Sequence, residues 1–449
     1  MKEFVIVGAG FRGFCDALHL LNQNPEQKLH IVDPAPFFGG VMNSLVVDGF
    51  NVDKGVHVFD SIPIELADVV NEIMEGQTCE IDFVSASAFN NKITEGFSLP
   101  DLASIDDQST KRQIEVELRE LAKDPPDQSQ AKTLRSLFDM RYGKTASDIF
   151  CNVFKKVYSI GADEVEATAI AQTSMGRLKF LPDDEMLQLK QDEWMDTVLA
   201  ARRKSVGKVD DFVSIYPDTG EAMKGFCDRA KEWLEAKGVS VHLGEKVTEI
   251  EDNATNVVVT TDKRTITADK LIWANDNVEA LGKALGHHTE VDDYQHGTPL
   301  VFYTLMTQAS EIKDFTYLQN FDPDGLTYRT AAAGIFSNQV REDGISFITC
   351  ECPSHQEASL WVNAEDHVMD VWNECRELGI VSDAATLVAH DIKRIPTSFK
   401  LAKIGYRQRI DAFCDEVSQK TNHVIIRNVI PFFRRDIYFD SAHLGDLVG

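Results

Sequence analysis

The chain has 449 residues, of which 43% are hydrophobic and 26% are charged, a composition typical of a folded protein with two or more domains. Asp and Glu number 72 against 45 Lys and Arg, so the formal net charge is −27. This charge argues against nucleic-acid binding and against attraction to anionic membranes. The sequence contains no run of eighteen apolar residues, so we expect no integral membrane segment.

The N-terminus passes directly from Met1-Lys2-Glu3 into an apolar run, which leaves no room for a signal peptide. The eight cysteines are scattered and show no zinc-ligand spacing. Cys350 and Cys352 are one residue apart, which in a strand places both thiols on one face, and we expect them in the core. We therefore expect a cytoplasmic protein with reduced cysteines and no metal site.

The apolar run at residues 4–7 predicts a buried parallel strand, and Gly8, Gly10 and Gly13 follow it. In a strand-to-helix turn with this spacing, the first glycine permits the tight bend and the second lets the backbone approach a pyrophosphate. The third lets the helix pack against the strand. The helix N-terminus offers free N–H groups to phosphates. These residues predict a dinucleotide-binding turn.

A second strand at residues 29–32 ends at Asp33, twenty positions after Gly13. An acidic residue at this distance hydrogen-bonds a ribose hydroxyl in dinucleotide-binding folds. Strand, turn, amphipathic helix, second strand and acid follow one another in the expected order. This order favours a dinucleotide site over a plain strand-to-helix turn.

Further elements follow in chain order. A loop rich in Pro and Gly contains Gly39 and Gly40, and the stretch at residues 49–59 comes next. Residues 65–203 have a mainly helical pattern with polar breaks, which predicts a helical insertion. After a turn at 216–220, the pattern predicts a helix ending at Gly238, a strand at 239–243, a meander over 247–267 and an apolar strand at 271–274.

The last third of the chain changes in character. Residues 298–351 are rich in β-branched and aromatic side chains, which predicts an antiparallel sheet with strands at 299–306 and 344–351. A helical pattern returns at 361–378 and again at 406–420. A strand is expected at 423–426, and an amphipathic stretch follows Asp440.

Three of these stretches together resemble one family. The glycine turn, the loop from Asp33 to Gly40 and residues 53–57 are similar to the FAD-dependent superfamily of amine oxidases, protoporphyrinogen oxidases, phytoene desaturases and UDP-galactopyranose mutases. Residues 216–274 and 427–449 resemble the second and the closing FAD-domain segments of that superfamily.

The resemblance implies an α/β fold: a Rossmann-like FAD-binding domain of the glutathione reductase type with an inserted α+β substrate domain. The FAD-binding domain would be discontinuous, at residues 1–64, 210–290 and 395–449. The substrate domain would comprise residues 65–209 and 291–394, a helical insertion plus an antiparallel sheet.

The resemblance also implies cofactor contacts. Gly8, Ala9, Gly10 and Gly13 would bind the FAD diphosphate, Asp33 the adenosine ribose, Gly39 and Gly40 the region near the flavin, and Val247 the adenine. Arg427 and residues 436–441, with Asp440 and Ser441, would contact the flavin end, where a helix N-terminus can stabilise negative charge. The chain departs from the family pattern at Val41, where many relatives carry Arg, and at Ile426, where they usually carry Gly.

Two residues are candidates for catalysis. His57 lies where UDP-galactopyranose mutases carry a histidine near the flavin; it would position substrate or move a proton, or else only bond to backbone at a strand end. Arg329 lies where some relatives place a substrate-facing arginine; it would bind a phosphate or carboxylate, or else be solvated at the surface.

Weaker candidates are Arg177, Arg202 and Arg203 for binding an anion, and Phe432, Phe433 and Tyr438 for the wall of a flavin cavity. The acidic run at residues 183–185 is expected to be a solvated surface. The sequence shows no nucleophilic triad and no nucleophile elbow, so the chemistry is expected to come from the cofactor.

The leading hypothesis from the resemblance is an FAD-dependent oxidoreductase in which hydride passes from a small-molecule substrate to flavin N5. A non-redox enzyme like the mutases, acting on a nucleotide sugar, is the second hypothesis, and a catalytically silent FAD-binding protein is the third. An NAD-dependent dehydrogenase fits the glycine turn but not residues 53–55 or the C-terminal segment. The substrate, the electron acceptor and a homo-oligomeric state all stay open.

Overall fold

The computed structural model describes residues 2–81, 84–202, 211–287, 289–313, 315–427 and 433–445. Contacts divide the chain into two compact units, each built from separated segments. Unit 1 comprises Met1–Asp82, Lys208–Asp293 and Gln408–Gly449, and unit 2 comprises Phe83–Gly207 and Tyr294–Arg407. Within the described ranges, no helix has both the length and the apolar character needed to cross a membrane.

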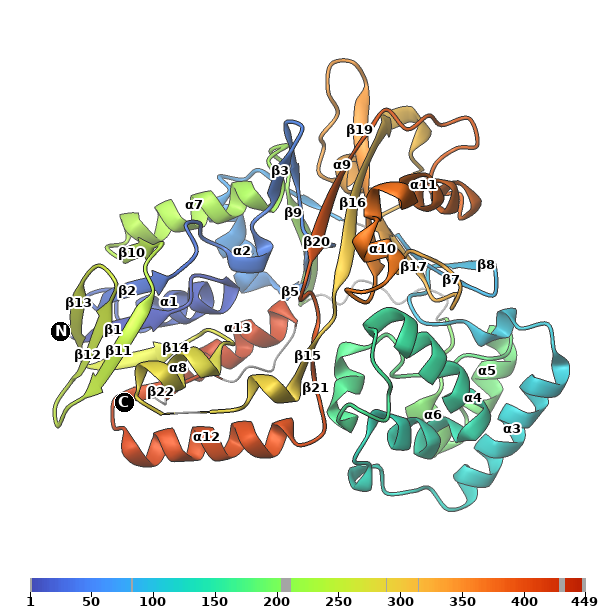
Figure 1. Ribbon diagram of the computed structural model, residues 1–449, viewed down its shortest axis with the longest axis horizontal. Helices are drawn as coiled ribbons and strands as arrows, with labels where there is room; N and C mark the ends of the chain where they lie inside the picture. Colours follow the sequence, from blue (N-terminus) through green and yellow to red (C-terminus); the bar gives the residue numbers. More distant parts are fainter. Residues whose placement is uncertain are drawn as a thin grey trace. The chain divides into compact units, whose positions relative to one another are not determined.

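A parallel sheet forms the centre of unit 1 (Figure 1). Its strands are, in spatial order, β10 (Ser240–Leu243), β2 (Lys28–Asp33), β1 (Glu3–Val7), β14 (Lys270–Trp273) and β22 (Val424–Ile426). Phe4, Val5 and Ile6 of β1 are fully buried, because the strand has a neighbour on each side and is covered on both faces. The predicted Rossmann-like α/β fold is confirmed.

The sequence predicted the helices of unit 1 at Phe11–Gln23, Ala222–Ala236 and Tyr406–Lys420, but not those at Val278–Ala284 and Arg434–Ala442. The helices of this unit are α1 (Phe11–Gln23), α2 (Ile64–Ile73), α7 (Ala222–Ala236), α8 (Val278–Ala284), most of α12 (Tyr406–Lys420), and α13 (Arg434–Ala442). Helix α1 connects β1 to β2, and α13 packs against α1. The α1–α13 contact brings the last described helix next to the first.

Smaller sheets complete unit 1. The predicted meander is confirmed as the antiparallel strands β11 (Val247–Asp252), β12 (Val257–Thr261) and β13 (Thr265–Ala268). A hairpin joins β3 (Leu45–Val47) and β4 (Phe50–Val52), and a further antiparallel sheet has the order β5 (Phe59–Pro63), β9 (Phe212–Pro217) and β6 (Thr78–Glu80).

A mixed sheet forms the centre of unit 2. Its strands are, in spatial order, β20 (Ala389–Ile395), β16 (Leu300–Gln308), β19 (Ile345–Pro353), β18 (Arg329–Ala331), β17 (Tyr317–Asn320), β7 (Ser85–Phe89) and β8 (Lys92–Glu95). The predicted antiparallel pairing holds for β16 with β19, whereas β17 pairs with β7 in parallel. Cys350 and Cys352 lie in the core on one face of β19, as expected.

Residues 65–203 were expected to be mainly helical, and most of the secondary structure in that stretch is helical. The three short strands β6, β7 and β8, which also lie in it, were not predicted. In β7, Ala86 and Ala88 enter the core beneath the sheet, and the strand has a partner on each side. Small side chains carry little strand propensity of their own, so pairing with distant segments decides the conformation here.

The remaining elements of unit 2 are mostly helical. They are α3 (Gln108–Lys123), α4 (Leu134–Tyr158), α5 (Asp183–Leu189), α6 (Glu193–Val198), α9 (Ala333–Phe336), α10 (Ser359–Val362), α11 (Val368–Glu377), and the strand pair β15 (Gln295–Gly297) and β21 (Lys400–Ala402). Short 3-10 helices of the whole chain lie at Gly40–Met42, Leu102–Ser104, Gln128–Gln130, Ala167–Gln172, Asp292–Tyr294, Ala309–Glu311 and Ala364–His367.

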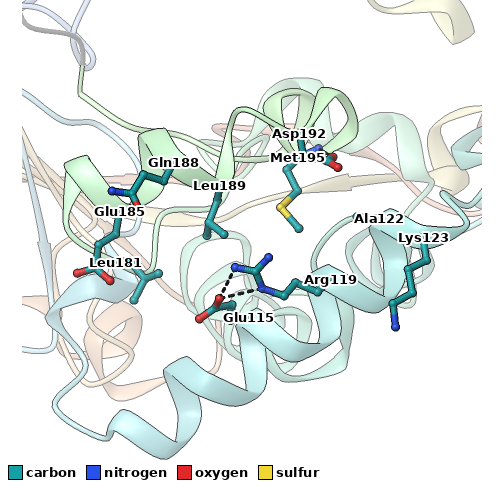
Figure 2. Close-up of a pocket in the computed structure, with 10 residues that line it drawn as sticks. All are labelled: Glu115, Arg119, Ala122, Lys123, Leu181, Glu185, Gln188, Leu189, Asp192 and Met195. Carbon is teal, nitrogen blue, oxygen red and sulfur yellow. Dashed lines mark hydrogen bonds and ion pairs between the residues drawn. The ribbon is translucent and has the colours of Figure 1, made fainter.

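A groove of about 490 Å³ lies between α3, α5 and α6 (Figure 2). Apolar Leu181, Leu189 and Met195 contribute to it, together with charged residues on its sides. Arg119 does not stand alone in this groove, because its guanidinium donates two hydrogen bonds to Glu115. None of the residues predicted to bind cofactor or substrate lines the groove.

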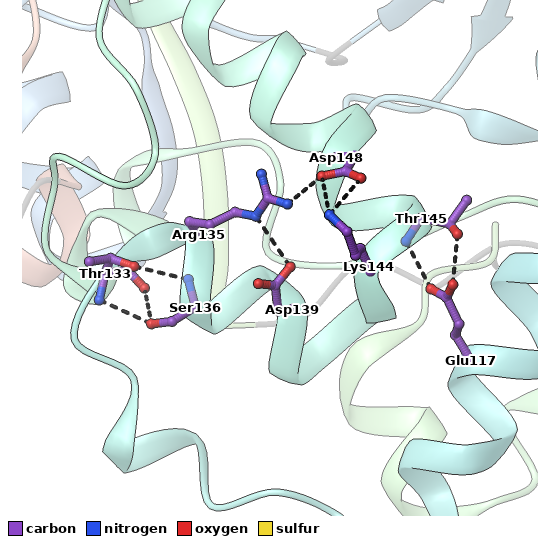
Figure 3. A network of polar contacts seen from close by, with 8 residues as sticks. All are labelled: Glu117, Thr133, Arg135, Ser136, Asp139, Lys144, Thr145 and Asp148. Carbon is purple, nitrogen blue, oxygen red and sulfur yellow. Dashed lines mark hydrogen bonds and ion pairs between the residues drawn. The ribbon is translucent and has the colours of Figure 1, made fainter.

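Helix α4 is interrupted at Gly143, whose φ of 76° lies in the left-handed region. The interruption leaves the N–H groups of the following turn without intrahelical partners. Glu117 of α3 accepts hydrogen bonds from the backbone N (2.8 Å) and the Oγ1 (2.7 Å) of Thr145 (Figure 3). A side chain from a neighbouring helix therefore caps the second half of α4.

Candidate functional site

The turn between β1 and α1 has the backbone geometry expected of its first and third glycines. Gly8 has a φ of 124°, and a Cβ on it would lie 3.2 Å from the backbone of Ala274. Its N–H donates to the carbonyl of Val32, at 2.9 Å. A Cβ on Gly13 would overlap the Gly8 carbonyl oxygen. Gly8 therefore makes the tight bend, and Gly13 allows the helix to pack closely.

Gly10 differs from these two glycines because the space beside it is open. In the described part of the chain, no atom lies within 4 Å of the position that a Cβ on Gly10 would take. Gly10 is also the N-cap of α1, with no side-chain cap and no acidic residue in the first helical turn. The N–H groups of that turn thus face an open space that suits a diphosphate.

Asp33 lies directly against the turn. Its carboxylate accepts hydrogen bonds from the backbone N of Ala9 at 2.8 Å and from that of Ala35 at 2.7 Å. The backbone N of Glu245 donates to the Asp33 carbonyl, at 3.0 Å, and Val247 follows two residues later at the start of β11. Asp33 and Val247 therefore lie on neighbouring segments at the carboxyl end of β2.

The loop with Gly39 and Gly40 lies on the same turn. The N–H of Gly39 donates to the Ala9 carbonyl at 2.8 Å, and Gly39 forms a parallel bridge with Gly10. Both loop glycines have positive φ, 98° and 58°. A Cβ on Gly39 would overlap the thiol of Cys227 on α7, so this loop requires glycine for both conformation and space.

Asp53 is a buried carboxylate whose partners the sequence did not reveal. It accepts hydrogen bonds from Ser44 Oγ (2.5 Å), Tyr216 Oη (2.6 Å) and the backbone N of Met223 (3.2 Å). Burial raises the pKa of Asp53 to about 6, although these hydrogen bonds oppose the rise. The only signal in the sequence was its place at the end of an apolar strand, before Lys54.

His57 is bound through both ring nitrogens. Arg434, the first residue of α13, lies with its Nη2 2.9 Å from His57 Nδ1 and donates from Nη1 to the Val58 carbonyl. A guanidinium can only donate, so Nδ1 accepts and Nε2 carries the proton, which it shares with the Lys54 carbonyl at 3.3 Å. Burial lowers the pKa of Arg434 to about 10. No motif in the sequence pointed to Arg434.

Asp440 joins α1 to the end of β22. It lies 2.6 Å from Arg12 Nη1 and 2.8 Å from Arg427 Nη2. The Arg427 Nε lies 3.3 Å from Asp16, which is fully buried. Burial raises the pKa of Asp16, and Arg427 opposes that rise.

The structure corrects one expectation about this network. Asp440 and Ser441 were expected to lie where a helix N-terminus stabilises negative charge, but they lie in the last turn of α13. The helix begins at Arg434 and not after Asp440. Its first intrahelical hydrogen bond runs from the N–H of Ile437 to the Phe433 carbonyl, so its open N-terminal N–H groups belong to residues 434–436. The negative end of the helix dipole lies beside Asp440, where Arg12 and Arg427 offset it.

Comparison with known proteins identifies the family. Residues 13–277 match the family described as flavin containing amine oxidoreductase, which is more than half of the chain. The chain belongs to this family. Flavin-containing amine oxidoreductases use FAD, so the predicted cofactor is confirmed, and the chain is an FAD-dependent enzyme. No curated protein sequence matches the chain.

Solved structures at 10–15% sequence identity share the fold of this chain. Reduced UDP-galactopyranose mutase has a TM-score of 0.75 and 15% identity, covering 100% of this chain and 94% of that one. Putrescine oxidase bound to putrescine has a TM-score of 0.62 and 14% identity, covering 98% and 96%. A fatty acid isomerase from P. acnes has a TM-score of 0.61 and 10% identity, covering 99% and 98%.

Arg329 is neither exposed nor unpaired. Its Nε and Nη2 donate to the two oxygens of Glu351, at 2.7 and 2.9 Å, across the β18–β19 pair. The Glu351 side chain is 5% exposed. The alternative of a solvated surface arginine is therefore wrong. An anion at this position would meet a guanidinium that a buried carboxylate already neutralises.

The weaker candidates have other partners. Arg177 donates to the Asp196 and Leu199 carbonyls, and Arg202 binds Asp183, so the acidic run is partly ion-paired. The ring of Tyr438 lies against that of His19 of α1, with the centroids 4.7 Å apart and the planes tilted by 46°. Phe433 is 56% exposed. Arg203 and Phe432 lie outside the described residues.

Proposed function

We propose that this chain is an FAD-dependent oxidoreductase that removes hydride from a C–H bond of a small-molecule substrate. Membership of the flavin-containing amine oxidoreductase family supports this reaction class. The observation that carries it in the structure is the open space beside Gly10, at an uncapped helix N-terminus in the parallel-sheet unit. Bound FAD would supply the hydride acceptor.

The residues of unit 1 would hold the cofactor as follows. Gly8, Ala9, Gly10 and Gly13 would surround the diphosphate, Asp33 would bind the ribose, and Val247 would lie beside the adenine. Gly39 and Gly40 would approach the flavin through their backbone. Arg427, Asp440 and Ser441 would brace the last helix against α1, and we assign them this supporting role in place of a dipole contact.

We assign unit 1 as the FAD-binding domain and unit 2 as the substrate domain. His57 would act as a positioning residue, because both of its ring nitrogens are already bound. Arg329, neutralised by Glu351, would fit a polar substrate group better than a strong anion. An amine or an uncharged substrate is therefore favoured over a diphosphate at this position.

Anaerobic reduction of the flavin tests the reaction. The FAD-loaded protein is mixed with a panel of primary amines, polyamines and uncharged alcohols, and absorbance near the flavin maximum is followed. We expect one class to bleach the flavin, and His57→Ala to slow bleaching roughly 10- to 100-fold with the FAD content unchanged. Protein that stays colourless after reconstitution with FAD, or flavin that no class reduces, would contradict the proposal.

A non-redox reaction like that of UDP-galactopyranose mutase is the second candidate. The His57 stretch favours it, as does the TM-score of 0.75 to the reduced mutase. Its test uses chemically reduced enzyme and UDP-galactopyranose without oxygen. Interconversion of the sugar without net oxidation would favour this candidate, and absence of any spectral change with UDP-sugars would remove it.

A further inference from the structure

Unit 2 contains a serine, a histidine and an aspartate in a linear hydrogen-bonded arrangement. Ser359 Oγ lies 2.9 Å from His367 Nε2, and His367 Nδ1 lies 3.0 Å from Asp370 Oδ2. Ser359 begins α10, His367 ends the 3-10 helix Ala364–His367, and Asp370 is in the first turn of α11. No sequence pattern indicated this triad, because no nucleophile-elbow motif surrounds Ser359.

The directions of the two hydrogen bonds suit nucleophilic catalysis by Ser359. The Asp370 carboxylate accepts a hydrogen bond from the Nδ1–H of His367, which leaves the Nε2 lone pair directed at the Ser359 hydroxyl. A nucleophile in hydrogen-bond reach of a base, with the base oriented by a third group, is the signature of an activated serine. Ser359 is exposed and the His367 side chain is 24% exposed, so solvent and small reagents reach both.

We propose that Ser359, His367 and Asp370 form a second active site, which hydrolyses small esters independently of FAD. Ser359 Oγ attacks the ester carbonyl carbon while its proton passes to His367 Nε2. The bond to the leaving alcohol then breaks as His367 returns that proton to the alcohol oxygen. Water then attacks the acyl carbon while one of its protons passes to His367 Nε2. The bond between the acyl carbon and Ser359 Oγ breaks as His367 returns that proton to Oγ, which releases a carboxylic acid and restores the serine.

The surroundings indicate the class of ester. Val362, one helical turn after Ser359 on α10, is 57% exposed, and Met369, beside Asp370, is 51% exposed. These apolar side chains suit a short acyl or aryl group. Glu365 and Asp366 precede His367 and, with Asp370, disfavour anionic esters. The substrate class is therefore a small, uncharged ester, for which 4-nitrophenyl acetate is the probe.

The first test uses a fluorophosphonate, which forms a bond from serine oxygen to phosphorus as fluoride leaves. The full-length FAD-loaded protein is treated, and the modified residue is found by peptide mass spectrometry. We expect the adduct on Ser359, and a labelling rate at least about 100-fold lower in His367→Ala. Asp370→Asn should slow labelling about fivefold, because Asp370 is 60% exposed, and Asp370→Glu should restore most of the rate.

His390→Ala is the matched control. His390 is also paired with a carboxylate, Glu365, at 3.1 Å, but no serine bonds its ring among the described residues. The His390→Ala variant should react with the fluorophosphonate and hydrolyse 4-nitrophenyl acetate at the rates of the wild type. A far-UV circular dichroism spectrum and a urea unfolding curve like those of the wild type show that each variant is folded. Flavin reduction by substrate is measured separately, so either activity can fail alone.

The second test is hydrolysis of 4-nitrophenyl acetate. The wild type should release 4-nitrophenol in an initial burst as the acyl-serine forms, followed by slower steady turnover. Ser359→Ala should abolish both the burst and the turnover above background. Turnover that persists in Ser359→Ala would mean that an imidazole acts without the serine, and it would overturn the proposal. No adduct on Ser359, or labelling that His367→Ala leaves unchanged, would also overturn it.

Discussion

Asp53 holds three segments of unit 1 together through Ser44, Tyr216 and Met223. Its pKa is raised by burial from 3.8 to about 6, so between these values the folded state keeps a proton that the unfolded chain releases. The stability that this group contributes is complete below pH 3.8 and is lost as pH rises through 6. A shift of two pKa units corresponds to about 3 kcal/mol.

We therefore predict that Asp53→Asn removes a pH-dependent component of stability. The difference in free energy of unfolding between variant and wild type should change by up to about 3 kcal/mol between pH 4 and 7, measured by urea denaturation. Asp324→Asn, at an exposed aspartate, is the control and should show no such change. Parallel pH profiles for Asp53→Asn and wild type would contradict the assignment.

Gly10 and Gly13 allow binding and folding to be separated at one turn. A methyl group on Gly10 meets open space, whereas one on Gly13 overlaps the Gly8 carbonyl. Gly13→Ala should therefore destabilise the FAD-free protein by about 1–3 kcal/mol. Gly10→Ala should leave the FAD-free protein within about 0.5 kcal/mol of wild type and weaken FAD binding roughly tenfold. Fluorescence titration with FAD and urea denaturation measure the two effects, and equal FAD affinity in Gly10→Ala would contradict the diphosphate assignment.

At the scale of elements, the break in α4 depends on a side chain from α3. Hydrogen bonds from Thr145 and Gln113 lower the pKa of Glu117 against the opposing effect of burial, so it stays ionised as a cap. Glu117→Ala should cost about 1 kcal/mol of unfolding free energy, as loss of a helix cap does. Glu120→Ala, on the exposed side of α3, removes an ion pair with Lys123 and should cost a few tenths of a kcal/mol. Equal midpoints in urea for both variants would show that the cap contributes nothing.

The elements also show what the sequence could predict. The strand, turn and helix at residues 4–23 followed from apolar runs and glycine spacing, because local sequence decides a tight turn and an amphipathic helix. Strand β7 did not follow, because its alanines become a strand only by pairing with β17 and β8. The start of α13 at Arg434 was missed because its pattern carries no strong apolar stripe before Asp440.

The candidate site was predictable to the same extent. Gly8, Gly13 and Asp33 lie where their spacing indicated, since they belong to one continuous turn and the strand beside it. The partners of Asp53 and His57 were not predictable, because Tyr216 and Arg434 are 163 and 377 residues away in the chain. Spacing in a sequence carries no information on contacts between side chains from such distant segments.

At the scale of the whole molecule, each unit is assembled from separated segments. If unit 1 alone holds FAD, the cofactor should stabilise that unit by linkage, because it binds the folded and not the unfolded state. At a free FAD concentration of about 100 times the Kd, the free energy of unfolding of unit 1 should rise by about 2.7 kcal/mol. The backbone amides of residues 8–13 and 33–40 should then exchange with deuterium more slowly.

Hydrogen exchange with mass spectrometry checks this prediction segment by segment. Peptides from β1, α1 and β2 should gain protection on addition of FAD, while peptides from α3 and α4 of unit 2 serve as the internal reference. In Gly10→Ala, the same FAD concentration should give a smaller increase in protection. A tenfold weaker Kd lowers the stabilisation by bound FAD by about 1.4 kcal/mol. Protection centred on unit 2, or unaltered by Gly10→Ala, would place the cofactor away from the turn and contradict the FAD-binding assignment of unit 1.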